Sequence, residues 1–387
     1  MKLDPKALLK ERTELFDNAY NFKHNKRVPL GCNIWSWQVL DCGYKQSQAL
    51  LNYDIAEKIN REFHERYQFD AYTNLITRNP MRLTELLGGG NHFLDPGDEM
   101  IQSVEHGYMD PEEFHEFAKE PEKFYWEKVF PRYLTQNKPE YTLTYGTFKK
   151  AMQEWQDFTA YSQKMLDMNI NEFGALMYYS RMVRLPLEHL ALDLRGLRGA
   201  SMDMRRKKDE ILEWSDSIFD SYSNMAGFNA VSSSELNGFV ADITMVWQVV
   251  SLMSPKQFET FYWPQLKRVI DNAAANHQKI FVAAQGTILR FADFLQEVPK
   301  GVMMIHPEGD DIRECREKLP NIALAGGLPT SILGISSAQE CLDYARRLVD
   351  DMGDGFVLCQ NQMISYRNDC KRENLLTYLD YFKTHTY

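Results

Sequence analysis

Residues 278–361 contain four short apolar runs: Ile280-Phe-Val-Ala-Ala284, Val302-Met-Met-Ile305, Ile322-Ala-Leu-Ala325 and Phe356-Val-Leu358. Each run is too short for a buried helix and suits a strand that is covered on both faces. A helical or turn-rich segment separates each run from the next, as in parallel α/β proteins. Ligands of such proteins bind at the carboxyl ends of the strands, so we expect the active site there.

The residues that follow these four runs have chemical or backbone character: Gln285–Gly286, His306–Pro307–Glu308, Gly326–Gly327 and Cys359–Gln360–Asn361. A helix is predicted between the last two runs, because Ser337 and Glu340 have the spacing of a capping box and Gly353 supplies a stop. The four strand ends are therefore predicted to form the rim of the active site.

Four further strands are predicted upstream, at Val28–Trp35, Asp70–Ile76, Phe173–Tyr179 and Gly238–Ile243. Eight strands with helical crossovers in one chain of 387 residues predict an α/β fold of the (β/α)8 TIM-barrel type. An open doubly wound sheet is the alternative, and the missing glycine-rich phosphate-binding motif weakens it. We expect a single domain over residues 1–387, with an N-terminal helical extension (1–26) and a β-hairpin insertion (87–109).

Composition excludes several classes of protein. The net charge of −10 and the isoelectric point near 5.5 argue against a nucleic-acid partner, which needs a basic face. No apolar run approaches the roughly 20 residues that span a bilayer, and no signal peptide is evident, so a cytoplasmic location without membrane contact is expected. The six cysteines form no CxxC pair and are interpreted as free thiols.

Five segments resemble, in order and spacing, the uroporphyrinogen decarboxylase superfamily. They are Leu194–Gly196 with Ser201–Met204, Asp242 with Ser254–Phe258 and Trp263–Pro264, Ile280–Thr287, Ala323–Gly327, and Gly355–Leu358 with Glu373–Leu375. The resemblance covers roughly residues 25–385 and implies a TIM barrel. It also implies one of two chemistries, which are cofactor-free decarboxylation of porphyrinogen acetates and methyl transfer between small donors, corrinoid proteins and thiols, usually through zinc.

The chain departs from both branches. The resemblance to the decarboxylase branch implies an arginine-rich N-terminal strand end that binds the substrate carboxylates. The corresponding segment here, Cys32–Trp37, has no arginine, so a highly anionic tetrapyrrole would lack its main binding residues. Where the thiol-using methyltransferases carry a His-x-Cys pair, this chain has Ala283 and Gln285. The resemblance then points to relatives that demethylate methyl ethers, with carboxylate and histidine ligands at neighbouring strand ends.

His306 and Glu308 are the leading catalytic candidates, because they follow a strand directly. His306 is a zinc ligand or general acid, or a histidine that hydrogen-bonds a neighbouring loop. Glu308 is a second ligand, a base or a charge at a helix N-terminus. Cys359 is a third tentative zinc ligand, with a buried strand residue as the simpler interpretation.

The other candidates are substrate-binding or supporting residues. Gln285 would orient an ether or carbonyl oxygen. Asp242 would take up a proton or hold a histidine, or would cap a helix. The remaining predicted substrate contacts are Trp35, Trp37, Tyr179, Asn361 and Gly327, and the aromatic ones could equally belong to the core.

These observations predict a methyltransferase that moves a methyl group from a small donor, such as an aromatic methyl ether, to a corrinoid protein. An ether oxygen is a poor leaving group, so its departure needs a Lewis acid or a proton donor. Zinc is the expected metal, and a homodimer is possible. The alternatives are a decarboxylase of a small acid and a catalytically silent barrel that binds a partner.

Overall fold

The computed structural model describes residues 4–73, 79–225 and 238–385, and it describes no side chains for residues 220–225. Its larger sheet has six strands, all paired in parallel. In spatial order these are β11 (Phe356–Gln360), β10 (Ala323–Leu328), β9 (Met303–Pro307), β8 (Ile280–Ala284), β7 (Ile243–Trp247) and β6 (Arg181–Met182). The apolar runs near the C-terminus therefore form neighbouring strands, as the sequence predicts.

A second parallel sheet holds three short strands, β1 (Gly31–Cys32), β2 (Ala71–Tyr72) and β5 (Leu176–Met177). An isolated parallel bridge pairs Leu30, just before β1, with Leu358 of β11 in the larger sheet, and another pairs Met177 of β5 with Phe239, which lies ahead of β7. The α/β class with parallel strands is thus confirmed. These three strands are shorter than predicted, and residues 74–76 of the predicted second strand lie outside the described residues.

The fourth predicted strand is displaced. Strand β7 begins at Ile243, where the predicted strand ends. Ahead of it, the Val240 amide donates to the Met177 carbonyl at 2.9 Å, so this part of the predicted strand bonds to β5 instead. Asp242 consequently lies at the amino end of β7 and not at its carboxyl end.

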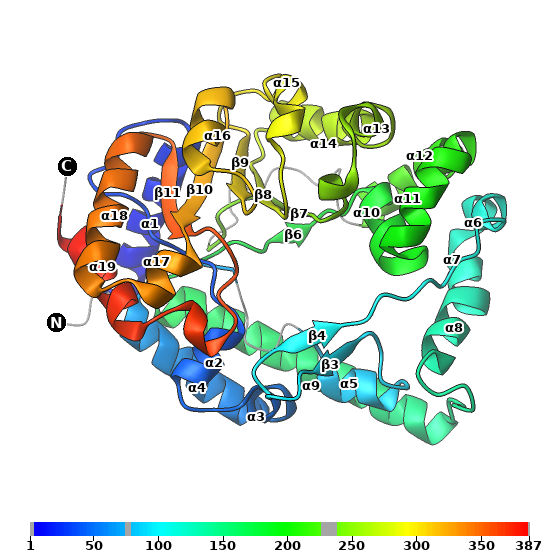
Figure 1. The fold of residues 1–387 in the computed structure, drawn as a ribbon. Helices are drawn as coiled ribbons and strands as arrows, with labels where there is room; N and C mark the ends of the chain where they lie inside the picture. The colour runs from blue at the N-terminus through cyan, green and yellow to red at the C-terminus, as the bar shows by residue number, and fades with distance from the viewer. Residues whose placement is uncertain (1–3, 74–78, 226–237, 386–387) are drawn as a thin grey trace.

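Helices surround the strands (Figure 1). Before β5 they are α1 (Pro5–Tyr20), α2 (Ser36–Asp41), α3 (Gln46–Leu51), α4 (Tyr53–Tyr67), α5 (Met81–Leu86), α6 (Phe114–Lys119), α7 (Pro121–Phe124), η1 (Tyr125–Val129), α8 (Phe130–Thr135), α9 (Tyr145–Asp167) and η2 (Met168–Glu172). Between β6 and β8 they are α10 (Pro186–His189), η3 (Leu190–Leu194), α11 (Gly196–Arg206), α12 (Lys208–Met225), η4 (Val249–Leu252), α13 (Pro255–Gln257), η5 (Phe258–Tyr262) and α14 (Trp263–Ala275). After β8 they are η6 (Leu289–Phe291), α15 (Ala292–Leu295), α16 (Ile312–Lys318), α17 (Thr330–Ile335), α18 (Ala338–Met352), η7 (Arg367–Asp369) and α19 (Arg372–Thr384).

Two additions to the strand-and-helix pattern matter for the site. The antiparallel pair β3 (His92–Leu94) and β4 (Ile101–Ser103) lies within residues 87–109, where the sequence predicts a hairpin. Helices α6–α8 and α10–α12 group on the side of the molecule away from the two chain ends (Figure 1). In the described part of the chain, no helix is long and apolar enough to cross a membrane.

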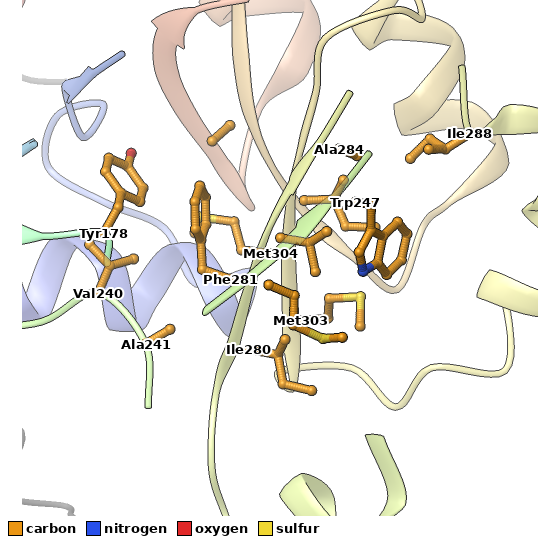
Figure 2. Packing of buried hydrophobic residues seen from close by; sticks show 14 of the residues in the cluster. Tyr178, Val240, Ala241, Trp247, Ile280, Phe281, Ala284, Ile288, Met303 and Met304 are labelled. Atoms are coloured by element: carbon orange, nitrogen blue, oxygen red, sulfur yellow. The ribbon is translucent and has the colours of Figure 1, made fainter. Parts of the chain in front are cut away.

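The core between the strands and their covering helices is continuous. Figure 2 shows Phe281, Met303 and Met304 packed in one cluster with Trp247. Trp247 is buried and meets Tyr262 edge-on, with ring centroids 6.1 Å apart, so it belongs to the core. Burial of these large side chains supplies the main driving force for this arrangement of strands.

Helix α1 is fastened at the amino ends of the strands by a buried ion-pair cluster. Asp70 accepts hydrogen bonds from Arg12 at 3.1 Å and from Arg27 at 2.7 and 2.9 Å. The Leu30 amide donates to the same carboxylate at 2.8 Å. These partners hold the pKa of Asp70 below its usual value even though the carboxyl is buried.

Candidate functional site

A cavity of about 580 Å³ lies at the carboxyl ends of the strands. We call it the strand-end cavity. Gln248, Gln285, Glu308 and Gln362 line it from just beyond β7, β8, β9 and β11, respectively. Its remaining lining is Trp35, Asn79, Thr330, Met363, Ser365, Tyr366 and Asp369, with His92, Met100, Ile101, Gln102 and Ser103 from the hairpin region.

Glu308 is the most perturbed acid in this lining. Its backbone amide donates to the Ala284 carbonyl at 3.0 Å, which fixes the residue just beyond the β8–β9 pairing. Burial raises the pKa of its carboxyl to about 7. Helix α16 is capped by Asp311, whose side chain accepts from the Arg313 amide at 2.8 Å, so Glu308 does not serve as that cap.

The Glu308 carboxyl receives no hydrogen bond or ion pair from any residue that the structure describes. A half-buried acid of this kind, with a pKa near 7 and access to a cavity, can hold a proton at neutral pH and release it to a ligand. This arrangement supports an acid–base role.

Gln285 and Gln248 form a pair across the neighbouring strand ends. The Gln248 Nε2 donates to the Gln285 Oε1 at 3.0 Å. Behind them, buried Glu188 accepts from the Gln248 amide at 2.9 Å and from the Tyr262 hydroxyl at 3.1 Å. Burial raises the pKa of Glu188 to about 7. The paired amides leave the Gln285 Nε2 as a donor that can orient a ligand oxygen.

Two glycines bring the loops after β8 and β9 together. A Cβ at Gly309 would lie 2.4 Å from the carbonyl carbon of Gly286, a distance that side chains do not tolerate. Gly286 itself has φ of 74°, and a Cβ there would lie 2.5 Å from the Ser251 Cβ. The close approach sets the separation of Gln285 and Glu308.

His306 lies inside β9, with only 3% of its surface exposed. Its Nε2 donates to the Gln360 carbonyl on β11 at 2.7 Å. Burial lowers the pKa of His306 to about 4, so the ring is neutral at physiological pH. The structure therefore favours the hydrogen-bonding interpretation of this histidine, and His306 is not part of the cavity lining.

Cys359 and Gly327 pair with each other across β10 and β11. Burial raises the pKa of Cys359 far above its usual value, so the thiol stays protonated. A Cβ on Gly327 would lie 2.6 Å from the Leu348 Cδ2, so this glycine permits close packing of β10 against α18. Neither residue belongs to the lining of the strand-end cavity.

The aromatic residues predicted to contact the substrate lie in different places. Trp35 lines the cavity with 8% of its surface exposed. Trp37 is in the core, where its Nε1 donates to the Cys370 carbonyl at 3.1 Å. Tyr179 is half-buried just after β5, and the Asn361 amide donates to the Leu328 carbonyl at 2.9 Å, but neither residue contributes to the cavity lining.

Asp242 lies at the other end of the strands, where its carboxylate accepts from the Lys279 amide at 2.8 Å. It is therefore not placed to act in the strand-end cavity. Across residues 4–73, 79–225 and 238–385, no three histidine, cysteine or acidic side chains form a group that could hold a metal ion.

Sequence analysis missed Gln248 and Glu188. The signal for Gln248 is present in the sequence, because Ile243–Trp247 is an apolar run that ends in glutamine just as Ile280–Ala284 does. The displaced fourth strand concealed it. Glu188 is found only from the fold, because its partners are 60 or more residues away.

Comparison with known proteins gives a structural neighbour. No family model matches the chain, and no curated protein matches it in sequence. A solved methyltransferase from Methanosarcina mazei superposes with a TM-score of 0.61 over 99% of this chain and 100% of that protein. Sequence identity is 13%, so the likeness shows a shared fold.

Proposed function

We propose that this chain is a methyltransferase of the uroporphyrinogen decarboxylase superfamily, which takes a methyl group from a small donor in the strand-end cavity and passes it to a corrinoid protein. We further infer that the two parallel sheets close into one (β/α)8 barrel within a single domain. The bridges at Leu30–Leu358 and Met177–Phe239 support that closure, and the shared fold with a methyltransferase supports the reaction class.

The observation that carries the proposal is Glu308 in its cavity. A carboxyl whose pKa is raised to about 7 is protonated in a large fraction of molecules at neutral pH. Loss of a methyl group from an ether or similar donor leaves an oxygen that must gain a proton. Glu308 is the lining residue whose protonation state suits that task.

In the proposed step, the bond between the methyl carbon and the donor oxygen breaks and its electron pair stays on the oxygen, which takes the Glu308 proton. The methyl carbon forms its new bond with the electron pair of the acceptor nucleophile, and Glu308 is left as a carboxylate. Gln285, held by Gln248, donates a hydrogen bond that orients the donor oxygen. A corrinoid delivered by a partner protein would supply the nucleophile.

The lining favours a donor without negative charge. None of the described lining residues is arginine or lysine, so a carboxylate would find no permanently charged cationic partner, and His92 is the only described lining side chain that can become cationic. The apolar surface of Trp35, Met100, Ile101 and Met363 suits a methyl or aromatic group. This composition supports methyl transfer over decarboxylation of a small acid.

The test is methylation of a reduced free corrinoid by the purified protein, with a panel of methyl ethers as donors and the corrinoid absorbance as the readout. Wild type should methylate the corrinoid with at least one donor. Glu308→Gln should lower the rate by about 100-fold or more, the range typical of general acid catalysis.

The matched control is Glu340→Gln, an acid in an exposed helix cap far along the chain, which should retain the wild-type rate. Absence of methyl transfer with every donor, or a Glu308→Gln rate equal to wild type, would overturn the proposal. Release of carbon dioxide from a small acid by the same preparation would establish the decarboxylase alternative.

A further inference from the structure

A second cavity of about 450 Å³ is lined by the helical segment α7–η1–α8 and by Asn91, Tyr108 and Asp193 from other parts of the chain. We call it the aromatic cavity. Five of its lining residues are aromatic: Tyr108, Tyr125, Trp126, Phe130 and Tyr133. The others are Val129, Asn91, Glu122 and Asp193. The strand-end cavity has none of these residues in its lining.

The ring arrangement is set by helical spacing. Trp126 and Phe130 are four residues apart on one helix face and stack with centroids 5.6 Å apart and planes at 15°. Tyr133 extends that face and meets Tyr108 from another segment at 5.9 Å and 56°. Aromatic residues therefore line the cavity both from the helical segment and from Tyr108 opposite Tyr133.

The charged lining residues are both acidic. Asp193 is ionised, because its hydrogen bond from His189 Nδ1 at 2.6 Å and its ion pair with Arg184 keep its pKa low. Glu122 makes no ion pair with any described residue. No lysine, arginine or histidine from the described ranges belongs to the lining. The faces of aromatic rings carry negative potential, and Arg184 already balances the charge of Asp193, so the rings together with Glu122 favour a positive ligand.

Many of the polar groups in the lining are already engaged. Asn91 Oδ1 accepts from Gln136 Nε2 at 2.7 Å, and the Tyr125 hydroxyl contacts His189 Nε2. A primary ammonium would lose hydrogen bonds to water that this lining cannot fully replace. A quaternary ammonium has no such hydrogen bonds to lose, and its methyl groups pack directly on ring faces.

We propose that the aromatic cavity binds an organic cation with a quaternary ammonium group. Trp126, Phe130, Tyr108 and Tyr133 contact the cation with their ring faces, and Glu122 supplies charge at the edge. This site is distinct from the strand-end cavity, and the proposal concerns binding alone. The binding proposal does not depend on the methyl-transfer reaction, and the two are tested by separate experiments.

The test compares choline with 3,3-dimethyl-1-butanol, which has the same shape but a carbon in place of the charged nitrogen. Binding to the full chain is measured by calorimetry. Choline should bind about tenfold more tightly, which corresponds to the strength of a partly desolvated cation–π contact. Equal binding of the two compounds, or no choline binding at 100 mM, roughly the limit of an accessible titration, would overturn the proposal.

Two matched tryptophan variants locate the site. Trp126 is 68% exposed and Trp155, on α9 outside the cavity, is 49% exposed, so either can be shortened without opening the core. Trp126→Leu should weaken choline binding by about five- to tenfold, and Trp155→Leu should leave it unchanged. An equal loss in both variants, or no loss in Trp126→Leu, would show that choline binds elsewhere and would contradict the assignment.

Discussion

The parallel strands have an acidic side chain near each end, buried Asp70 and half-buried Glu308, and the surroundings of the two carboxyl groups are opposite. At the amino ends, Asp70 receives bonds from two arginines and a backbone amide, and its pKa is lowered. At the carboxyl ends, Glu308 receives no bond from a described residue, and burial raises its pKa to about 7. The first group is fully satisfied by the fold, and the second is left for a ligand.

The amino ends of the strands therefore contribute to stability, and the carboxyl ends hold the group that is available for chemistry. A satisfied ion-pair cluster holds α1 against the strands and has no accessible proton. An unsatisfied acid costs stability in its charged form and is retained where it can act. Substitutions at the two ends should therefore have different consequences.

The largest expected effect is on stability, at the amino ends. Asp70→Asn removes the carboxylate shared by the buried Arg12 and Arg27, and Arg27 keeps only its second acidic partner, Glu11. Leaving the buried charge of Arg12 without an ion-pair partner costs about 3–5 kcal/mol. The midpoint of urea unfolding should fall sharply, and the variant should accumulate poorly at 37 °C.

Asp242→Asn is the control for this prediction. Asp242 also lies at the amino ends, but it accepts from one backbone amide, and asparagine keeps that acceptor. Its unfolding midpoint should change by less than the equivalent of about 1 kcal/mol. An Asp70→Asn protein as stable as the Asp242→Asn protein would show that the arginine cluster is not a structural lock.

The next effect is on catalysis and its pH dependence. The acid form of Glu308 is lost as the pH rises through about 7, so kcat/KM for methyl transfer should fall above that pH. In Glu308→Gln the rate should fall by about 100-fold or more and should not follow this titration. A wild-type profile that stays flat between pH 6 and 8.5, roughly the window of this titration, would refute the assignment of Glu308 as the acid.

Stability should show opposite pH windows for the two carboxyls. The Asp70 contribution is present above its unfolded pKa and is lost as the pH falls through its lowered folded value. The Glu308 contribution is present below its unfolded pKa and is lost as the pH rises through about 7. Glu308→Gln should therefore gain thermal stability relative to wild type at alkaline pH, and a loss there would contradict the raised pKa.

A smaller effect is expected from the loops that place Glu308. Gly309→Ala puts a methyl group 2.4 Å from the Gly286 carbonyl carbon and must push the loops apart. Overpacking of this kind costs about 1–3 kcal/mol, and the displaced Glu308 should also lower kcat. Gly146→Ala, where the added Cβ meets no atom closer than 3.9 Å, is the neutral control. Equal stability and rate in the two variants would show that the close approach is not needed.

The strands near the C-terminus are predictable from sequence because each is buried by its own apolar run. The exact ends are not, because pairing continues beyond the last apolar residue. Strands β9, β10 and β11 extend two or three residues past the predicted ends. His306, Gly327 and Cys359 are thereby drawn into the sheet, where backbone pairing and packing decide their contacts.

Residues just beyond the ends of these strands line the cavity instead, as Glu308 does after β9 and Gln362 after β11. Gln285 lies in the cavity lining just beyond β8, because β8 ends where its apolar run ends. The short strands β1, β2 and β5 were predicted too long, since apolar residues around them are buried by helices and by isolated bridges rather than by continuous pairing. The Glu188 contacts depend on tertiary structure and leave no local pattern.

The smallest expected effect is at Gln248, which lies between the two extremes of the comparison. Like Asp70, Gln248 has hydrogen-bond partners within the protein, which are Glu188 and Gln285, yet like Glu308 it borders the cavity.

Gln248→Leu should free the Gln285 side chain at a cost of about 1 kcal/mol, close to one hydrogen bond. This should appear as a roughly fivefold rise in KM with little change in kcat, because orientation and not proton transfer is lost. Gln153→Leu on exposed α9 should match wild type. If Gln248→Leu instead lowered kcat as strongly as Glu308→Gln, the glutamine pair would have to take part in the proton transfer, and the division between a positioning pair and a single acid would fail.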